Sequence, residues 1–489
     1  MEVEQGGKLE EGLEDDLENP ERGSRLVERI GLFAGIVLAV TAYFTGPMLG
    51  LTHEATWVFA LLALMASWWI TLAVDPAVTG LLPFIALSLL GIGTPGELAA
   101  PYANDVMFLF GGGALLAFGI ERTGVSARVA TEIVRLAGTS PLRVLAALML
   151  VTALMSAFVS NLATAATMLP LAMALGKRAH NGAVDDAQRA ASRRFATSLL
   201  LGVAFASSIG GALTIIGSPP NPIAVKWLTN NGHEMDFYRW LSFSVPVTAV
   251  FLPIAVAILG LWLFPTRGLV VSTASLRSAP IERDGWMTLA VFLVAVLAWV
   301  TRPLYSKAFP VIQDGTIAIG CASVLFLIPS VARRGRALLD GSAFARVPWR
   351  VLILFGGGLC LADAMQRSGL SSALGTAISA AGALPSFGVL AVMVTCMVLA
   401  SEVVSNTTLA AMAVPIVGAL APGLGIPPER LVIPAVFAAS WAFALPVGTP
   451  PNALVFASGQ VRTRDMMRAG IVLDIAAIVV IVVMAQLLL

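Results

Sequence analysis

Long apolar runs separated by short polar segments dominate the chain after its first 25 residues. A helix needs about 20 mostly apolar residues to cross the hydrocarbon core of a bilayer. Runs of this kind predict eleven transmembrane helices, near residues 28–46, 56–73, 77–92, 104–120, 195–216, 241–264, 285–301, 311–330, 349–366, 431–447 and 470–489. The pattern therefore predicts an all-α polytopic membrane protein.

Two further apolar runs, 143–176 and 386–420, are too long for one helix and too short for two comfortable crossings. Each is interrupted near its middle by a Ser-Asn pair. Polar, non-helical backbone at membrane depth is tolerated only where it is buried in protein or lines a cavity. We therefore expect two re-entrant hairpins, each entering and leaving on the same side. Two short tilted crossings, or one kinked helix, are the alternatives.

Loop charges favour the re-entrant arrangement. With a cytoplasmic N-terminus and two re-entrant hairpins, twenty Lys and Arg residues after the tail fall on the cytoplasmic side and six on the outside. This matches the positive-inside rule, and the bias collapses if either hairpin is a full crossing. The acidic segment 1–25 lacks the pattern of a signal peptide and is predicted to be a disordered cytoplasmic tail. We expect a multi-pass protein of the plasma (bacterial inner) membrane with its C-terminus outside.

Composition agrees with this class and excludes others. The chain is 57% hydrophobic and 12% charged, with a mean hydropathy of +0.87, far outside the globular range. A formal net charge of +1 gives no indication of a nucleic-acid partner. Cys321, Cys360 and Cys396 lie in apolar stretches without metal-ligand spacing and are predicted to be core residues.

The two halves of the chain repeat one another. SNLATAATMLP from Ser160 matches SNTTLAAMAVP from Ser405, and FLFGGGALLAFGIERTGVSARVA from Phe108 matches LILFGGGLCLADAMQRSGLSSALG from Leu352. Further on, IGSPPNPIA (216–224) matches VGTPPNALV (447–455). An odd number of crossings separates the copies, so the repeats are inverted. Inverted repeats with interrupted helices point to a secondary transporter whose site lies near the bilayer midplane. A duplicated unit without transport is the alternative.

The interruptions suggest what is bound. Proline removes a donor and breaks a helix, which leaves free carbonyl groups at one end and free N–H groups at the other. Neutral oxygens from carbonyls, Ser and Asn suit Na⁺, whereas a divalent ion normally requires carboxylates. Helix N-termini suit anions. The FGGG runs lack the Lys-Ser/Thr of a phosphate loop and are predicted to allow close helix packing.

The paired Ser-Asn-Thr and Pro-Pro-Asn motifs resemble the divalent anion/sodium symporter family, which carries di- and tricarboxylates or sulfate. The resemblance covers almost the whole chain from about residue 26. It implies a homodimer with elevator-type alternating access, in which a scaffold (26–120 and 284–366) holds a moving transport domain (141–264 and 385–489). The first repeat then spans 26–264, and a cytoplasmic linker (265–283) joins it to the second repeat (284–489). The implied function is Na⁺-coupled uptake of a small divalent anion, with a C4-type dicarboxylate as the leading substrate.

The resemblance, together with the unwound stretches, implies two kinds of site residue and two or more co-transported Na⁺ ions. The predicted Na⁺ ligands are Ser156, Ser160, Asn161, Gly217, Asn221, Ser401, Ser405, Asn406, Gly448 and Asn452. The predicted substrate contacts are Asn161, Leu162, Thr164, Ser218, Pro219, Asn406, Thr407, Thr449 and Pro450. No catalytic residue is predicted.

Two positions depart from these patterns. Leu162 stands where the family pattern and the second copy have Thr, and losing a hydroxyl to a charged oxygen costs about 1.5–3 kcal/mol. Either Thr164 replaces that hydroxyl, or the substrate is apolar or uncharged near this tip. Glu402 stands where the first copy has Ala157. An intramembrane carboxylate has a function by default: it carries a proton, neutralises a cation or pairs with an arginine.

Other functions stay open. A Na⁺-independent anion exchanger, a sulfate or other oxyanion transporter, and a transporter related to the arsenite pumps all fit the inverted repeat. An intramembrane enzyme would need a catalytic constellation in its spans. The sequence has no His-Glu-x-x-His, no Gly-x-Ser-x-Gly and no paired intramembrane aspartates flanked by glycine, so we expect no enzymatic activity.

Overall fold

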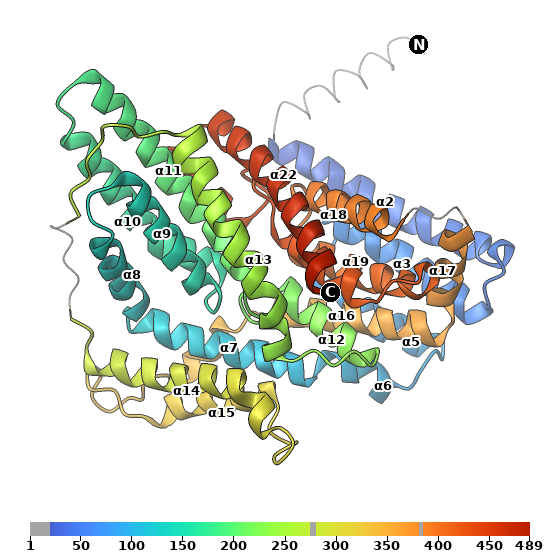
Figure 1. Cartoon of the computed structure of the whole chain (residues 1–489). Helices are drawn as coiled ribbons and strands as arrows, with labels where there is room; N and C mark the ends of the chain where they lie inside the picture. The colour runs from blue at the N-terminus through green and yellow to red at the C-terminus, as the bar shows by residue number, and fades with distance from the viewer. Residues whose placement is uncertain (1–19, 274–279, 381–384) are drawn as a thin grey trace, which may run out of the picture. The chain divides into compact units, whose positions relative to one another are not determined.

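The computed structural model describes residues 20–273, 280–380 and 385–489 (Figure 1). Over these ranges the chain is helical, and its only β-type pairing is an isolated bridge between Pro329 and Ala337. The all-α prediction is therefore confirmed. Most of the predicted tail, and residues 274–279 of the predicted linker, lie outside the described residues.

Within the described residues, seven helical segments are long and apolar enough to cross a membrane: Leu26–Thr45, His53–Thr71, Pro95–Arg122, Asp186–Gly211, Phe237–Leu263, Arg283–Tyr305 and Thr463–Leu488. Shorter apolar helices occupy Pro76–Leu89, Pro141–Ser156, Asp314–Leu327, Ser386–Ser401 and Asn406–Leu420. At the predicted crossing 431–447 the helix is shorter than expected and spans Glu429–Ser440, whereas at 195–216 it is displaced and spans Asp186–Gly211. The arrangement supports a multi-pass membrane protein.

The chain forms two compact units. The first comprises residues 1–102 and 350–381. Its helices are α2 (Pro20–Thr45), α3 (His53–Thr71), α4 (Pro76–Gly80), α5 (Leu82–Leu89), α6 (Pro95–Ala99), α16 (Trp349–Arg367) and α17 (Leu370–Ala380). Here α2 packs along α3, and α4 lies so close to α16 that a Cβ on Gly357 would collide with the Gly80 carbonyl group.

The second unit comprises residues 103–349 and 382–489 and contains every predicted site residue. Its part within 103–349 contains α7 (Asp105–Arg122), α8 (Val125–Leu136), α9 (Pro141–Ser156), α10 (Asn161–Asn181), α11 (Asp186–Gly211), α12 (Pro220–Asn230) and α13 (Phe237–Ala257) of the first repeat, and α14 (Arg283–Tyr305) and α15 (Asp314–Leu327) of the second. The rest of its helices are α18 (Ser386–Ser401), α19 (Asn406–Leu420), α20 (Glu429–Ser440), α21 (Pro450–Ala457) and α22 (Thr463–Leu488). The division into scaffold and transport domains stays a prediction.

The glycine runs allow close helix packing, as predicted. A Cβ on Gly112 of α7 would lie 2.7 Å from the backbone of Ala318 in α15, and one on Gly113 would lie 3.0 Å from Ile216. Gly357 has the corresponding role in the second copy of the motif, against α4. Because glycine has no side chain, neighbouring segments can pack closely against α7 and α16 at these residues.

Both predicted hairpins break at their Ser-Asn pairs. Residues 157–160 separate α9 from α10, and residues 402–405 separate α18 from α19. The 16 residues of α9 and of α18 span about 24 Å at 1.5 Å per residue, less than the ~30 Å hydrocarbon core. Whether each hairpin enters and leaves on one side stays a prediction.

The two repeats interlock inside the second unit. The first hairpin's α10 packs against α21 of the second repeat, and the second hairpin's α19 packs against α12 of the first. Gly418 makes the second contact possible, because a Cβ there would collide with the Trp227 ring. The Phe251 ring of α13 also stacks on Trp441, at 4.5 Å between centroids. The hairpins of one repeat are thus supported by the other.

Candidate functional site

The first unwound segment, residues 212–219, lies between α11 and α12 and is almost wholly buried. The chain there makes few regular helix hydrogen bonds, and the fully buried Asn221 compensates. Its Nδ2 donates to the carbonyl oxygens of Gly211 (2.9 Å) and Thr214 (2.7 Å). Unpaired backbone groups in a buried segment are costly, so this amide stabilises the break.

The second unwound segment, residues 441–449, uses the same device. Asn452 Nδ2 donates to the carbonyl oxygens of Ala442 (3.2 Å) and Leu445 (3.1 Å). Each residue of this set lies 231 positions after its counterpart in the first repeat, so the duplication extends to individual hydrogen bonds. Asn221 and Asn452 were expected in unwound backbone, but they lie in the first turns of α12 and α21.

The first hairpin tip meets the first unwound segment at two glycines. Ser156 Oγ donates to Asn161 Oδ1 at 2.8 Å, and a Cβ on Gly211 would collide with that same amide. A Cβ on Gly217 would lie 2.7, 2.8 and 2.9 Å from the carbonyl oxygens of Gly211, Ala157 and Ser156. Backbone carbonyls from the tip and the unwound segment therefore converge on Gly217.

This cluster has more acceptors than donors. Besides the converging carbonyls, the buried Oδ1 of Asn221 has no hydrogen-bond partner among the described residues. The Gly211 carbonyl oxygen accepts from Asn221 Nδ2 and the Ala157 carbonyl oxygen from the Thr214 hydroxyl, so Asn221 Oδ1 is the acceptor left over. Buried acceptors are normally satisfied, and neutral oxygens suit a monovalent cation. The Na⁺ role of Ser156, Asn161 and Gly217 stays a prediction.

The second tip is organised differently in detail. Ser401 Oγ donates to the carbonyl oxygens of Val398 (3.1 Å) and Ala438 (3.4 Å) rather than to Asn406. The Asn406 amide nitrogen donates to the Ser440 carbonyl oxygen at 3.4 Å. Three buried oxygens nearby in the fold lack a partner among the described residues: Asn406 Oδ1, Ser440 Oγ and Asn452 Oδ1. The two asparagine oxygens are thus acceptors without a donor, like Asn221 Oδ1 in the first half, and the indole N–H of Trp441 is also buried without a partner among the described residues.

Glu402 gives the second half a charge that the first half lacks. Its Oε1 accepts the N–H of Ala444 (2.8 Å), and its Oε2 accepts that of Leu445 (2.7 Å). The carboxyl group of Asp474, from α22, lies against Glu402 and accepts the N–H of Phe443 at 3.2 Å. Among the described residues Glu402 forms no ion pair with an arginine, which removes one of its three predicted roles.

The predicted substrate contacts differ in accessibility. Leu162 is 47% exposed, and Thr407, Pro219 and Pro450 are half-buried or exposed. Thr164, Ser218 and Thr449 are buried, and the Thr449 hydroxyl accepts the N–H of Asn452 as a helix cap. Because the Thr164 hydroxyl is fully buried, it is poorly placed to replace the hydroxyl missing at Leu162. The substrate role of these residues stays a prediction.

Three residues of the site were missed by sequence reasoning. Asp474 carried a usable signal, because it is a carboxylate inside the apolar run 470–489 and meets the criterion that identified Glu402. Thr214, whose hydroxyl donates to the Ala157 carbonyl oxygen, and Ser440 carried none. Their counterparts in the other repeat, Leu445 and Ile209, are apolar, so the repeat comparison could not find them.

Comparisons with known proteins identify relatives of this chain. Residues 60–429 match a family model described as citrate transporter. The sodium-dependent dicarboxylate transporter SdcS of Staphylococcus aureus strain bovine RF122 / ET3-1 is 35% identical over 474 residues, covering 93% of this chain and 90% of the relative. The same-named protein of strain NCTC 8325 / PS 47 is 34% identical over the same shares. The crystal structure of the Alcanivorax borkumensis YdaH transporter has a similar fold, with a TM-score of 0.54 at 17% identity, over 88% of this chain and 98% of that one.

Proposed function

This chain belongs to the divalent anion/sodium symporter family, and on that premise we propose that it is a secondary active transporter coupling Na⁺ to uptake of a small dicarboxylate. A C4-type dicarboxylate is the leading substrate. The relatives from Staphylococcus aureus are sodium-dependent dicarboxylate transporters. The proposal includes no enzymatic activity.

One observation carries the cation part of the proposal. Two duplicated positions, around Gly217 and Gly448, bring together buried oxygens, and beside each an asparagine, Asn221 or Asn452, has an Oδ1 without a partner among the described residues. Desolvating such oxygens without a partner costs about 1–3 kcal/mol each. A bound Na⁺ at each position offsets that cost. We assign one Na⁺ to each repeat.

The anion part rests on helix N-termini. The helices α10 and α19 begin at the Ser-Asn tips, and their first N–H groups carry partial positive charge. The positive charge of two bound Na⁺ ions adds to this field and favours a dianion. Binding of the anion therefore depends on prior or simultaneous binding of Na⁺, which is the physical basis of symport.

The same proposal extends to architecture and location. It assigns residues 26–120 and 284–366 to a dimeric scaffold and residues 141–264 and 385–489 to the part that moves. It places the homodimer in the plasma membrane, with the N-terminus in the cytoplasm and the C-terminus outside. Cysteine accessibility at the two ends of the chain, and crosslinking of scaffold cysteines between subunits, test these assignments.

Uptake of labelled succinate into proteoliposomes tests the function. We expect uptake with an inward Na⁺ gradient and none with an equal K⁺ gradient. Asn452→Ala is expected to raise the Na⁺ concentration for half-maximal uptake about tenfold or more, since hydrogen bonds to charged groups contribute about 1.5–3 kcal/mol. Asn230→Ala, at the exposed end of α12, is the matched control.

Other outcomes separate the alternatives. Uptake driven by internal succinate, equal in Na⁺ and K⁺, would identify a Na⁺-independent exchanger and contradict the proposed coupling. Uptake of sulfate, with neither uptake of succinate nor competition by it, would overturn the proposed substrate class. The proposed Na⁺ coupling would stay intact.

A further inference from the structure

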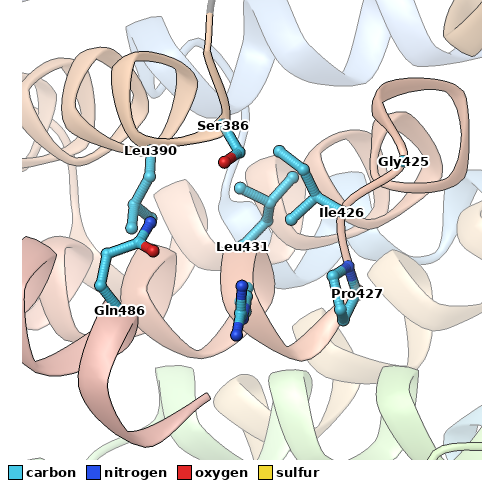
Figure 2. A pocket seen from close by; sticks show the side chains of 8 residues that line it. Ser386, Leu390, Gly425, Ile426, Pro427, Leu431 and Gln486 are labelled. Carbon is cyan, nitrogen blue, oxygen red and sulfur yellow. The ribbon is translucent and has the colours of Figure 1, made fainter.

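A small cavity in the second unit lies where three helices begin or end. It has a volume of about 60 Å³. α18 begins there at Ser386, α20 begins at Glu429, and α22 ends at Leu488. None of the residues of the predicted transport site lines it. Its lining residues are Ser386, Leu390, Gly425, Ile426, Pro427, Arg430, Leu431 and Gln486 (Figure 2).

Arg430 gives the cavity a positive charge, and none of the described residues neutralises it. Its Nε is buried without a hydrogen-bond partner, and the guanidinium forms no ion pair within the part of the chain that the structure describes. The adjacent carboxylate, Glu429, is engaged by His233, whose Nδ1 lies 2.5 Å from its Oε1. A partly buried, unpaired guanidinium is unfavourable unless an anion binds it.

Neutral donors surround the same space. The Ser386 hydroxyl and the Gln486 amide both line it (Figure 2). α18 begins at Ser386 after Pro385, with no side-chain cap, so the N–H groups of its first turn add partial positive charge. The amide and hydroxyl donors reinforce the guanidinium, which can bind two oxygens of one oxyanion at once.

The position relative to the bilayer identifies the source of the oxyanion. The 26 residues of α22 extend about 39 Å, longer than the ~30 Å hydrocarbon core, and Gln486 lies in its last turn. The cavity is therefore at the membrane boundary, where lipid phosphates lie. Leu390, Ile426 and Leu431 provide the apolar wall that the adjoining glycerol and acyl groups require.

We propose that this cavity binds the phosphate group of an anionic lipid, with Arg430 as its principal ligand and Gln486 and Ser386 as additional donors. The site is distinct from the transport site, and the proposal does not depend on the transported substrate.

Native mass spectrometry of the full-length protein in detergent, titrated with phosphatidylglycerol or with phosphatidylethanolamine, tests the site. We expect preferential retention of phosphatidylglycerol and a fall in its affinity of about tenfold or more in Arg430→Gln. Arg239→Gln is the matched control, because Arg239 is exposed and pairs with Glu234 at 3.4 Å. Gln486→Leu provides a second variant, expected to weaken binding less than Arg430→Gln does.

A parallel arm distinguishes the sources of phosphate. Thermal unfolding is followed in Na⁺-free K⁺ buffer, with phosphatidylglycerol and with potassium phosphate at equal ionic strength. Stabilisation by the lipid alone supports the proposal, whereas equal stabilisation by inorganic phosphate keeps the phosphate site and overturns the lipid as its occupant. Unchanged phosphatidylglycerol affinity in both cavity variants would overturn the site altogether.

Discussion

Asn221 and Asn452 each replace a missing stretch of helix hydrogen bonding with one side-chain amide. Each donates to two carbonyl groups three residues apart in an unwound segment. The nitrogen is used for structure, and the oxygen is left free for a ligand. One residue thus couples the shape of the segment to its capacity to bind a cation.

Asn221→Leu tests the structural half of this role. The substitution leaves the Gly211 carbonyl group without its donor and the Thr214 carbonyl group with only the Gly217 N–H, and an unpaired buried group costs about 1–3 kcal/mol. We expect a clear fall in the melting temperature in detergent, measured in K⁺ buffer so that Na⁺ binding does not contribute. Asn230→Leu should be near neutral, and an equal effect of both changes would contradict the assignment.

The carboxyl groups of Asp474 and Glu402 accept three consecutive backbone N–H groups, those of residues 443–445. Substitutions of Asp474 can therefore separate the effect of its charge from that of its hydrogen bond. Asp474→Asn keeps an oxygen acceptor for the Phe443 N–H, whereas Asp474→Leu removes it. We expect the Leu variant to be destabilised by about 1–3 kcal/mol and the Asn variant by much less. Thermal unfolding of the pair decides this, and equal destabilisation would show that the carboxylate charge matters more than the hydrogen bond.

At the scale of helices, the glycine run of α7 sets how closely α15 can approach. A side chain at Gly112 must displace the backbone of Ala318, which lies 2.7 Å from the position of a Cβ. Backbone moves less readily than the end of a side chain, so the cost exceeds that of an ordinary substitution in a helix.

Gly112→Val is therefore expected to destabilise the protein by about 1–3 kcal/mol or more through overpacking. The control is Gly320→Ala in α15, where a Cβ meets nothing within 4 Å. That change should be neutral or stabilising by about 0.5–1 kcal/mol, because alanine favours a helix more than glycine does. Melting temperatures of the two variants measure the contrast, and a tolerated Gly112→Val would refute the close contact.

Helix breaks were more predictable than helix lengths. The Ser-Asn pairs and the Pro-Pro-Asn motifs marked where helices end, because polar groups and proline oppose a continuous apolar helix. The unwound segments begin earlier than expected, at residues 212 and 441. The Gly210-Gly211 pair is a local stop signal directly before the first segment, whereas the second segment has no such pair before it. The hydrogen bond from the Thr214 hydroxyl to the Ala157 carbonyl oxygen depends on a tertiary contact that no local pattern encodes.

At the scale of the whole molecule, Na⁺ binding should be visible as stability. A ligand that binds only the folded state stabilises it by about 2.7 kcal/mol at a hundred times its dissociation constant. We expect NaCl to raise the melting temperature above that in KCl at equal ionic strength, and succinate to add to this only when Na⁺ is present. Equal melting temperatures in the two salts would contradict binding of Na⁺ to the folded protein.

The crossed packing of the two repeats has a consequence for biosynthesis. α10 ends at Asn181, and its partner α21 begins at Pro450, so the ribosome must add the intervening chain before the first hairpin is covered. At about 5–20 residues per second, this interval lasts on the order of tens of seconds. During that time an incomplete, polar-tipped hairpin is present in the membrane or its insertion machinery. The fold of the first half is thus completed only by the last part of the chain to be made.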